Sequence, residues 1–80
     1  MAQTEVPSPL PGIFYRRPNP DSEPFVVEGQ TIREEDIIGV IEVMKLFHEL
    51  EAGVAGTLLE FRVENGAEIV AGQVLAIVEN

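Results

Sequence analysis

The chain has 80 residues, no cysteine and a net charge of −9, from fourteen acidic and five basic side chains. This length supports one domain with a single small core, and the lack of cysteine excludes disulfides and thiolate metal sites. The charge argues against a nucleic-acid partner, which requires clustered Lys or Arg, and no membrane-length apolar run or signal-peptide pattern is present, so we expect a cytoplasmic protein without a membrane partner.

Residues 1–9 are rich in proline and polar side chains and show little apolar periodicity, which predicts a mobile amino-terminal tail. The folded domain is expected to cover residues 10–80. Within it, short β-branched and apolar segments alternate with glycine-containing turns, the pattern of an all-β protein. The strand candidates are GIFY (12–15), PFVV (24–27), DIIGVIEVM (36–44), FHELEA (47–52), GTLLEFRV (56–63), AEIV (67–70) and QVLAIVE (73–79).

Several segments allow more than one interpretation. EVMKLFHEL (42–50) could be an amphipathic helix, but it lacks a good start cap and follows a run of Val and Ile, so we expect a strand. REED (33–36) lacks the spacing of a metal loop and is expected to be a solvated turn; no metal site is predicted. His48 is expected to be a polar strand residue, and Asn65-Gly66 a turn.

An internal repeat organises these strands. An offset of 37 residues aligns Val26 with Val63 and Gly29 with Gly66, whereas further upstream Gly12 aligns with Gly56 at an offset of 44. The difference is a seven-residue insertion in the first copy, within RRPNPDSEP (16–24), which is expected to be a surface loop. Because each copy alone would expose an apolar face, we expect a flattened antiparallel β-sandwich or barrel with pseudo-twofold symmetry.

The single lysine, Lys45, follows the end of the first copy, where the chain crosses to the second. A tight hairpin with Met44, Lys45 and Leu46 at its bend is the simplest geometry. Lysine is almost never fully buried without a partner, so an exposed tip is predicted. One interpretation is a solubilising turn lysine. The apolar neighbours instead favour a surface that another protein recognises, and covalent modification of Lys45 is the alternative hypothesis.

The segment EVMKLF closely resembles the biotin-attachment motif of biotinyl domains in biotin-dependent carboxylases. SPLPGIFYRRPNPDSEPFVVEGQ (8–30) resembles the equivalent segment of the biotin carboxyl carriers of bacterial acetyl-CoA carboxylases. The resemblance, over residues 8–79, implies two four-stranded antiparallel sheets and biotin joined to Lys45 through an amide. It also implies that Met44 and Leu46 flank the site and are recognised by a biotin protein ligase, and that Glu42 begins the motif. Related lipoyl domains typically carry Asp before the lysine, so Met44 selects biotin.

The same resemblance identifies the insertion at 16–24 as the protruding thumb of acetyl-CoA carboxylase carriers, which folds back toward the biotin. Its residues are Arg16, Arg17, Pro18, Asn19, Pro20, Asp21, Ser22, Glu23 and Pro24. The prolines restrict φ and lower the entropy lost when the loop is ordered. Arg17 departs from the family pattern, in which a small or hydroxylated residue is common, and an arginine here is expected to alter how the thumb meets the biotin ring.

The resemblance implies a non-catalytic carrier rather than an enzyme. An ATP- and bicarbonate-dependent biotin carboxylase would carboxylate the biotin on Lys45, and a carboxyltransferase would take the carboxyl group, most simply for malonyl-CoA formation by acetyl-CoA carboxylase in fatty acid biosynthesis. A biotinyl carrier of another carboxylase, acting on another acyl-CoA, urea or a small amide, is the alternative. A lipoyl domain or an unmodified interaction module is the second alternative.

Overall fold

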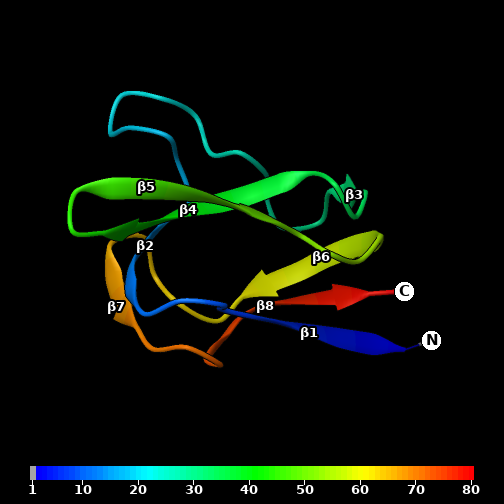
Figure 1. Cartoon of the computed structure of the whole chain (residues 1–80). Coiled ribbons are helices and arrows are strands. Elements are labelled where there is room, and N and C mark those ends of the chain that lie inside the picture. The colour runs from blue at the N-terminus through cyan, green and yellow to red at the C-terminus, as the bar shows by residue number, and fades with distance from the viewer. Residues whose placement is uncertain (1) are drawn as a thin grey trace.

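The computed structural model describes residues 2–80, which form strands and loops without a helix (Figure 1). The strands are β1 (Gln3–Pro7), β2 (Gly12–Tyr15), β3 (Thr31–Ile32), β4 (Ile37–Val43), β5 (Leu46–Glu51), β6 (Gly56–Phe61), β7 (Ala67–Ile69) and β8 (Val74–Glu79). They make two antiparallel four-stranded sheets, ordered β1-β8-β6-β3 and β5-β4-β2-β7. The predicted fold class is therefore confirmed. No helix among the described residues is long and apolar enough to cross a membrane.

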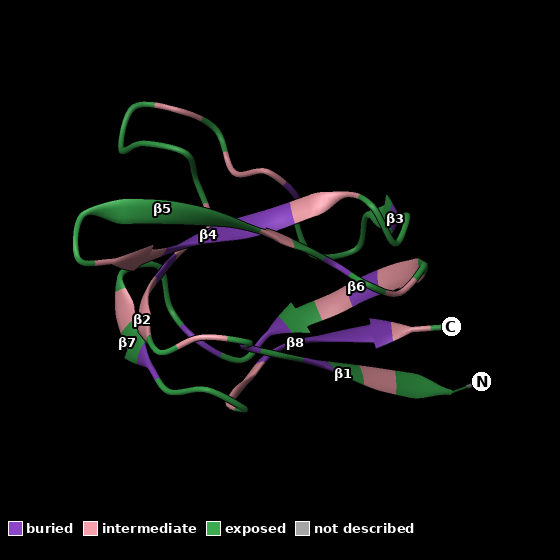
Figure 2. Cartoon of the chain, viewed as in Figure 1, coloured by how far each residue is buried: buried purple, intermediate pink, exposed green. Residues whose placement is uncertain are grey.

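The hydrophobic core lies between the two sheets. Phe14 and Ile41 from one sheet, and Leu58 and Leu75 from the other, are at most 1% exposed. The rings of Phe14 and Phe61 approach to 6.1 Å between centroids and tie the second strands of the two repeat copies together. Figure 2 shows burial concentrated in the central strands β4 and β8, whereas the edge strand β5 is exposed along almost its whole length.

The two sheets are related by the pseudo-twofold symmetry expected from the repeat. In the order of the sheets, β5, β4, β2 and β7 correspond to β1, β8, β6 and β3. The turns before β4 and β8 each contain an equivalent hydrogen bond. The amide of Arg33 donates to Asp36 Oδ2 at 2.8 Å, and the amide of Val70 donates to Gln73 Oε1 at 3.0 Å. The symmetry therefore extends from strand order to individual turn residues.

The mobile tail predicted at residues 1–9 is contradicted at residues 3–7, which form a strand, and Met1 lies outside the described residues. Gln3–Pro7 form β1, an edge strand that pairs antiparallel with β8 and buries Val6. The chain ends meet beside it, since the amide of Asn80 donates to the Ala2 carbonyl at 2.8 Å. The prediction treated proline as a sign against a strand. An edge strand tolerates proline, however, and Pro7 lies where the register shifts. The domain boundary at residue 10 is corrected accordingly, and β1 supplies the counterpart of β5.

The strand predicted at 24–27 does not form either. The amide of Val27 donates to Gln30 Oε1 at 3.1 Å, so this backbone is satisfied by a turn instead of a ladder. A two-residue strand, β3, follows instead and pairs with the start of β6. The segment 42–50, in contrast, forms the end of β4 and most of β5, which confirms the strand over the helix.

Candidate functional site

The hairpin between β4 and β5 presents Lys45 on a two-residue turn. Val43 pairs with Leu46, and the two residues between them have positive φ, 52° at Met44 and 67° at Lys45. This is the type I′ geometry, whose twist matches that of the flanking strands. Asparagine and glycine usually occupy it, because a left-handed conformation costs other residues about 1–2 kcal/mol each. The hairpin tip predicted from the sequence is confirmed, and its backbone is strained.

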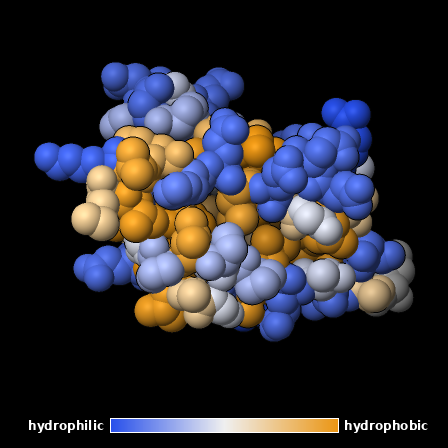
Figure 3. Space-filling model, in the orientation of Figure 1, coloured by the Kyte–Doolittle hydropathy of each residue, from blue (hydrophilic) through white to orange (hydrophobic). Residues whose placement is uncertain are grey.

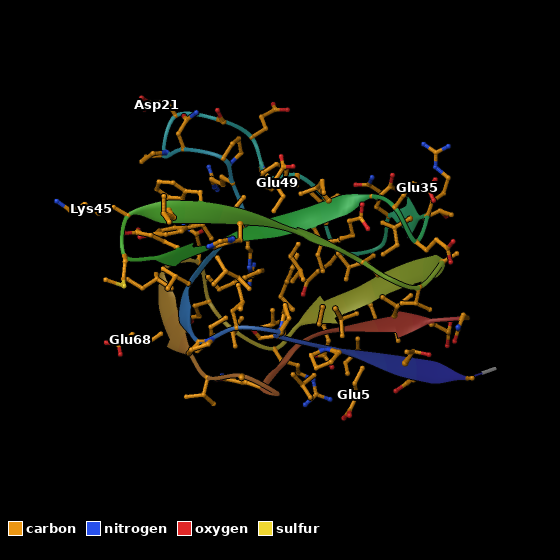
Figure 4. All side chains as sticks on the ribbon, in the orientation of Figure 1. Glu5, Asp21, Glu35, Lys45, Glu49 and Glu68 are labelled. Carbon is orange, nitrogen blue, oxygen red and sulfur yellow. The ribbon has the colours of Figure 1, made fainter. Side chains whose placement is uncertain are left out.

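The hairpin surface is apolar around the lysine. Met44 is 90% exposed, and Leu46 and Phe47 are 64% and 61% exposed. Figure 4 shows Lys45 pointing away from the body of the protein, and Figure 3 shows apolar surface at this end of the molecule. Exposed apolar side chains gathered around one ammonium are typical of a surface that another protein recognises.

The hairpin and the chain termini lie at opposite ends of the molecule (Figure 1). Glu42, before the hairpin, corresponds through the repeat to Glu79, before the end of the chain. The pseudo-twofold axis therefore relates the lysine hairpin at one end of the molecule to residues 79 and 80 at the other.

The thumb, residues 16–24, is a loop beside β5 and contains no strand (Figure 1). The amide of Phe25 donates to the Arg16 carbonyl at 3.0 Å and closes the neck of the loop. Farther out, the amide of Ser22 donates to the Asn19 carbonyl at 3.1 Å, and Arg17 Nη1 donates to the Ser22 carbonyl at 3.3 Å. Asp21 lies at the outer end of the loop (Figure 4). The insertion predicted from the repeat is thus an ordered loop with its own hydrogen bonds.

A cavity of about 290 Å³ separates the thumb from the hairpin strands. Its lining comes from both repeat copies and consists of Tyr15, Arg17, Pro18, Asn19, Pro20, Glu42, Phe47 and Asn65. This volume is near the lower limit of pockets that hold small molecules. A more open groove lies beside it and is lined by Pro18, Phe25, Val40, Phe47, His48 and Glu49.

A hydrogen bond joins two of the residues that line this cavity. The hydroxyl of Tyr15 on β2 donates to Glu42 Oε1 on β4 at 3.3 Å. Partial burial raises the pKa of Tyr15 above its ordinary value, and the negative charge of Glu42 and this hydrogen bond raise it further. The cavity therefore contains a neutral phenol held against a carboxylate.

The structure brings together only part of the predicted site. Arg17, Pro18, Asn19, Pro20 and Glu42 line the cavity, but the remaining thumb residues do not. Arg16 turns to the other side, where its guanidinium carbon lies 4.3 Å from the centroid of the Phe61 ring. Its Nε is buried without a hydrogen-bond partner, and the ring face compensates in part.

Tyr15, Phe47 and Asn65 also line the cavity but were not predicted as site residues from the sequence. Phe47 could have been found, because alternation along the hairpin of β4 and β5 places it on the face that carries Glu42. Tyr15 reaches this face only because β2 pairs with β4. Asn65 was interpreted only as a turn residue. REED forms the predicted turn, with ion pairs from Arg33 to the exposed Glu35 and to the partly exposed Asp36. No group of side chains in residues 2–80 is arranged to hold a metal ion.

The fold and the exposed lysine turn are those of the biotinyl and lipoyl class of domains. The chain belongs to the family described as biotin-requiring enzymes, whose model matches residues 4–78. It is 44% identical over 71 residues to the biotin carboxyl carrier protein of acetyl-CoA carboxylase from Nostoc sp., covering 89% of this chain and 39% of the relative. The corresponding protein of Pseudomonas aeruginosa is 41% identical over 70 residues, covering 88% and 45% of the two chains.

These comparisons confirm the resemblance recognised in the sequence. The chain spans less than half the length of these two relatives, 39% and 45%. Among solved structures, urea carboxylase from Kluyveromyces lactis is similar, with a TM-score of 0.80, 20% identity and coverage of 99% of this chain and 6% of that one. At this identity, the likeness shows the fold alone.

Proposed function

We propose that this chain is the biotin carboxyl carrier domain of an acetyl-CoA carboxylase, with biotin joined to Lys45 Nζ through an amide. One observation carries the proposal: the single lysine of the chain stands exposed on a strained two-residue turn, in a chain about 40% identical to biotin carboxyl carrier proteins. Among residues 2–80 its ammonium forms no ion pair, so an acylating enzyme need not break one.

Attachment replaces the leaving group of an activated biotin carboxyl group by Nζ, and the amine loses a proton. Only a neutral amine attacks a carboxyl group, so we propose that a biotin protein ligase desolvates or deprotonates the lysine before acylation. Met44, Leu46 and Phe47 offer that ligase apolar contacts on both sides of the amine. The turn presents Lys45 to the ligase, because the ladder between β4 and β5 holds the turn backbone in a single orientation.

The ureido ring of bound biotin would supply the nitrogen on which a carboxyl group is carried between a biotin carboxylase and a carboxyltransferase. This chain itself contributes a tether: the flexible lysine side chain keeps the ring at high local concentration near whichever partner is docked. No residue of the hairpin is needed as an acid or base, and the domain is proposed to be a non-catalytic carrier.

The cavity under the thumb supports a second part of the proposal, that the ring rests there between visits to its partners. Glu42 offers an acceptor for ureido N–H groups, Arg17 and Asn19 offer donors, and Phe47 offers an apolar wall. The cavity residues Arg17–Pro20 are therefore the part of the thumb assigned to biotin contact. Asp21, Ser22, Glu23 and Pro24 are proposed to act only through the shape of the loop.

Intact-mass analysis after expression with a biotin ligase tests the assignment of Lys45. We expect the mass to rise by one biotin in the parent chain and to stay unchanged in Lys45→Arg, which keeps the positive charge but has no acylatable amine. A lipoyl group in place of biotin would contradict the proposal.

Reconstitution with acetyl-CoA carboxylase subunits then tests the acceptor of the carboxyl group. Transfer only to urea or to another acyl-CoA would contradict that part of the proposal alone.

A further inference from the structure

The second half of the chain holds the base of the thumb. The amide of Arg16, the first thumb residue, donates to Asn65 Oδ1 at 2.7 Å, and Arg16 Nη2 donates to the Val63 carbonyl at 2.6 Å. The Arg16 guanidinium also lies against the Phe61 ring. These contacts join residues 47 and 49 positions apart in the chain.

The pseudo-twofold axis relates this hydrogen bond to a second one. Glu28 corresponds to Asn65 through the offset of 37, and Glu28 Oε2 accepts the amide of Phe61 at 2.8 Å. The glycines that follow also match, because the amide of Gly29 donates to Leu58 and that of Gly66 to Phe14, at 2.6 and 2.7 Å. In both copies, a turn side chain accepts a backbone amide near the end of the second strand.

The two hydrogen bonds differ in what they hold. In the second copy the bonded amide belongs to Phe61, the last residue of β6. In the first copy the bonded amide belongs to Arg16, directly after β2 and at the start of the inserted loop. In the second copy the hydrogen bond is therefore made at the end of β6. In the first copy the equivalent hydrogen bond fixes the direction in which the thumb leaves β2.

Asn65 also lines the cavity, together with Arg17 and Phe47. The side chain that holds the thumb at its base is thus part of the wall that the thumb closes. We propose that Asn65 is a positioning residue, which keeps the thumb over β4 and β5 so that the cavity stays formed. Its consequence for the biotin rests on the function proposed above, whereas the positioning itself is a property of the unmodified chain.

Backbone NMR on the unmodified chain tests the positioning. In Asn65→Ala, we expect the Arg16 amide to exchange with solvent roughly fivefold faster, because a hydrogen bond of about 1 kcal/mol is lost. Resonances of Arg17, Asn19 and Ser22 should shift with it. Asn65→Asp keeps an acceptor oxygen at the same place and should retain both the slow exchange and the parent thumb resonances.

Glu28→Ala is the matched control, because it removes the symmetry-related hydrogen bond without touching the thumb. It should speed exchange of the Phe61 amide and leave the thumb resonances in place. Thumb resonances unchanged in Asn65→Ala, or not restored in Asn65→Asp, would overturn the proposal. Equal thumb shifts in Glu28→Ala would overturn it too, since they would indicate a general loss of stability.

Biotinylated chains, with attachment first established by mass, test the consequence. Biotinylation should shift the resonances of Arg17 and Phe47 in the parent chain and in Glu28→Ala, and at least tenfold less in Asn65→Ala. Equal shifts in all three chains would overturn the consequence. Failure of Lys45 to accept biotin would contradict the proposed function, while the experiment on unmodified chains would still decide the role of Asn65.

Discussion

At the scale of single residues, the site combines a strained backbone turn with a hydrogen bond from a phenol to a carboxylate. Met44 and Lys45 both adopt positive φ, and Tyr15 places a phenol against the Glu42 carboxylate. Strained backbone of this kind persists only where the surrounding structure over-determines it. Here the ladder between β4 and β5 does so, and the result is a turn whose backbone holds one orientation below the flexible lysine side chain.

Replacing Met44 by glycine should separate the stability of the turn from its recognition. Glycine adopts positive φ without the Cβ penalty, so we expect Met44→Gly to raise the free energy of unfolding in urea by up to about 1 kcal/mol. Biotinylation should become slower, because an exposed apolar contact is lost. Gly53→Ala, at φ 73° with open space around the added Cβ, is the reverse control and should lose about 1 kcal/mol. A marked loss of stability in Met44→Gly would show that the turn is not strained.

The pKa of Tyr15 can be measured directly, because it is the only tyrosine and the chain lacks tryptophan. We expect an ultraviolet titration to give a midpoint above the ordinary value of about 10, since burial and Glu42 disfavour the phenolate. Glu42→Gln should lower the midpoint but leave the contribution of burial.

The folded chain holds this proton more tightly than the unfolded chain, so the stabilisation is complete below about pH 10 and is lost as pH rises through the folded pKa. Tyr15→Phe should remove this contribution to alkaline unfolding. A titration midpoint of Tyr15 at or below the ordinary value would contradict the contact with Glu42.

At the scale of elements, β1 is the segment whose role only the structure revealed. It covers the edge of β8, as β5 covers the edge of β4 in the other sheet. Val6 is its buried side chain, and the neighbouring Glu5 is exposed. Its contribution to stability therefore depends on one apolar contact and a ladder of backbone hydrogen bonds.

Substitution of Val6 tests that role. Val6→Ala should lower the free energy of unfolding by about 1–2 kcal/mol, since it removes buried methyl groups and leaves a cavity. Glu5→Ala, on the opposite face of the same strand, should stay within about 0.5 kcal/mol of the parent. Urea denaturation of the two variants measures the difference. Equal stabilities would mean that the Val6 side chain contributes nothing to the fold.

At the scale of the whole molecule, pseudo-twofold symmetry explains both the site and its position. Gly12 and Gly56 lie at equivalent points, with φ of 157° and 154°, and a Cβ at either would meet the carbonyl oxygen of Glu42 or Glu79. The second strand of each copy thereby passes close to the end of the fourth. In the first copy that end leads into the lysine hairpin, and in the second it leads to Asn80, which lies at the opposite end of the molecule (Figure 1).

The sequence by itself determined the fold class, the repeat, the thumb as an insertion and the exposed hairpin around Lys45. These features depend on local patterns, namely strand alternation, turn glycines and the position of one charged residue among apolar ones. Only the tertiary structure decided the pairing of β1, the cavity and the hydrogen bonds from Tyr15 to Glu42 and from Arg16 to Asn65. Those contacts join residues 27 and 49 positions apart, and no local pattern encodes which distant side chain meets a given amide or hydroxyl once the sheets have packed.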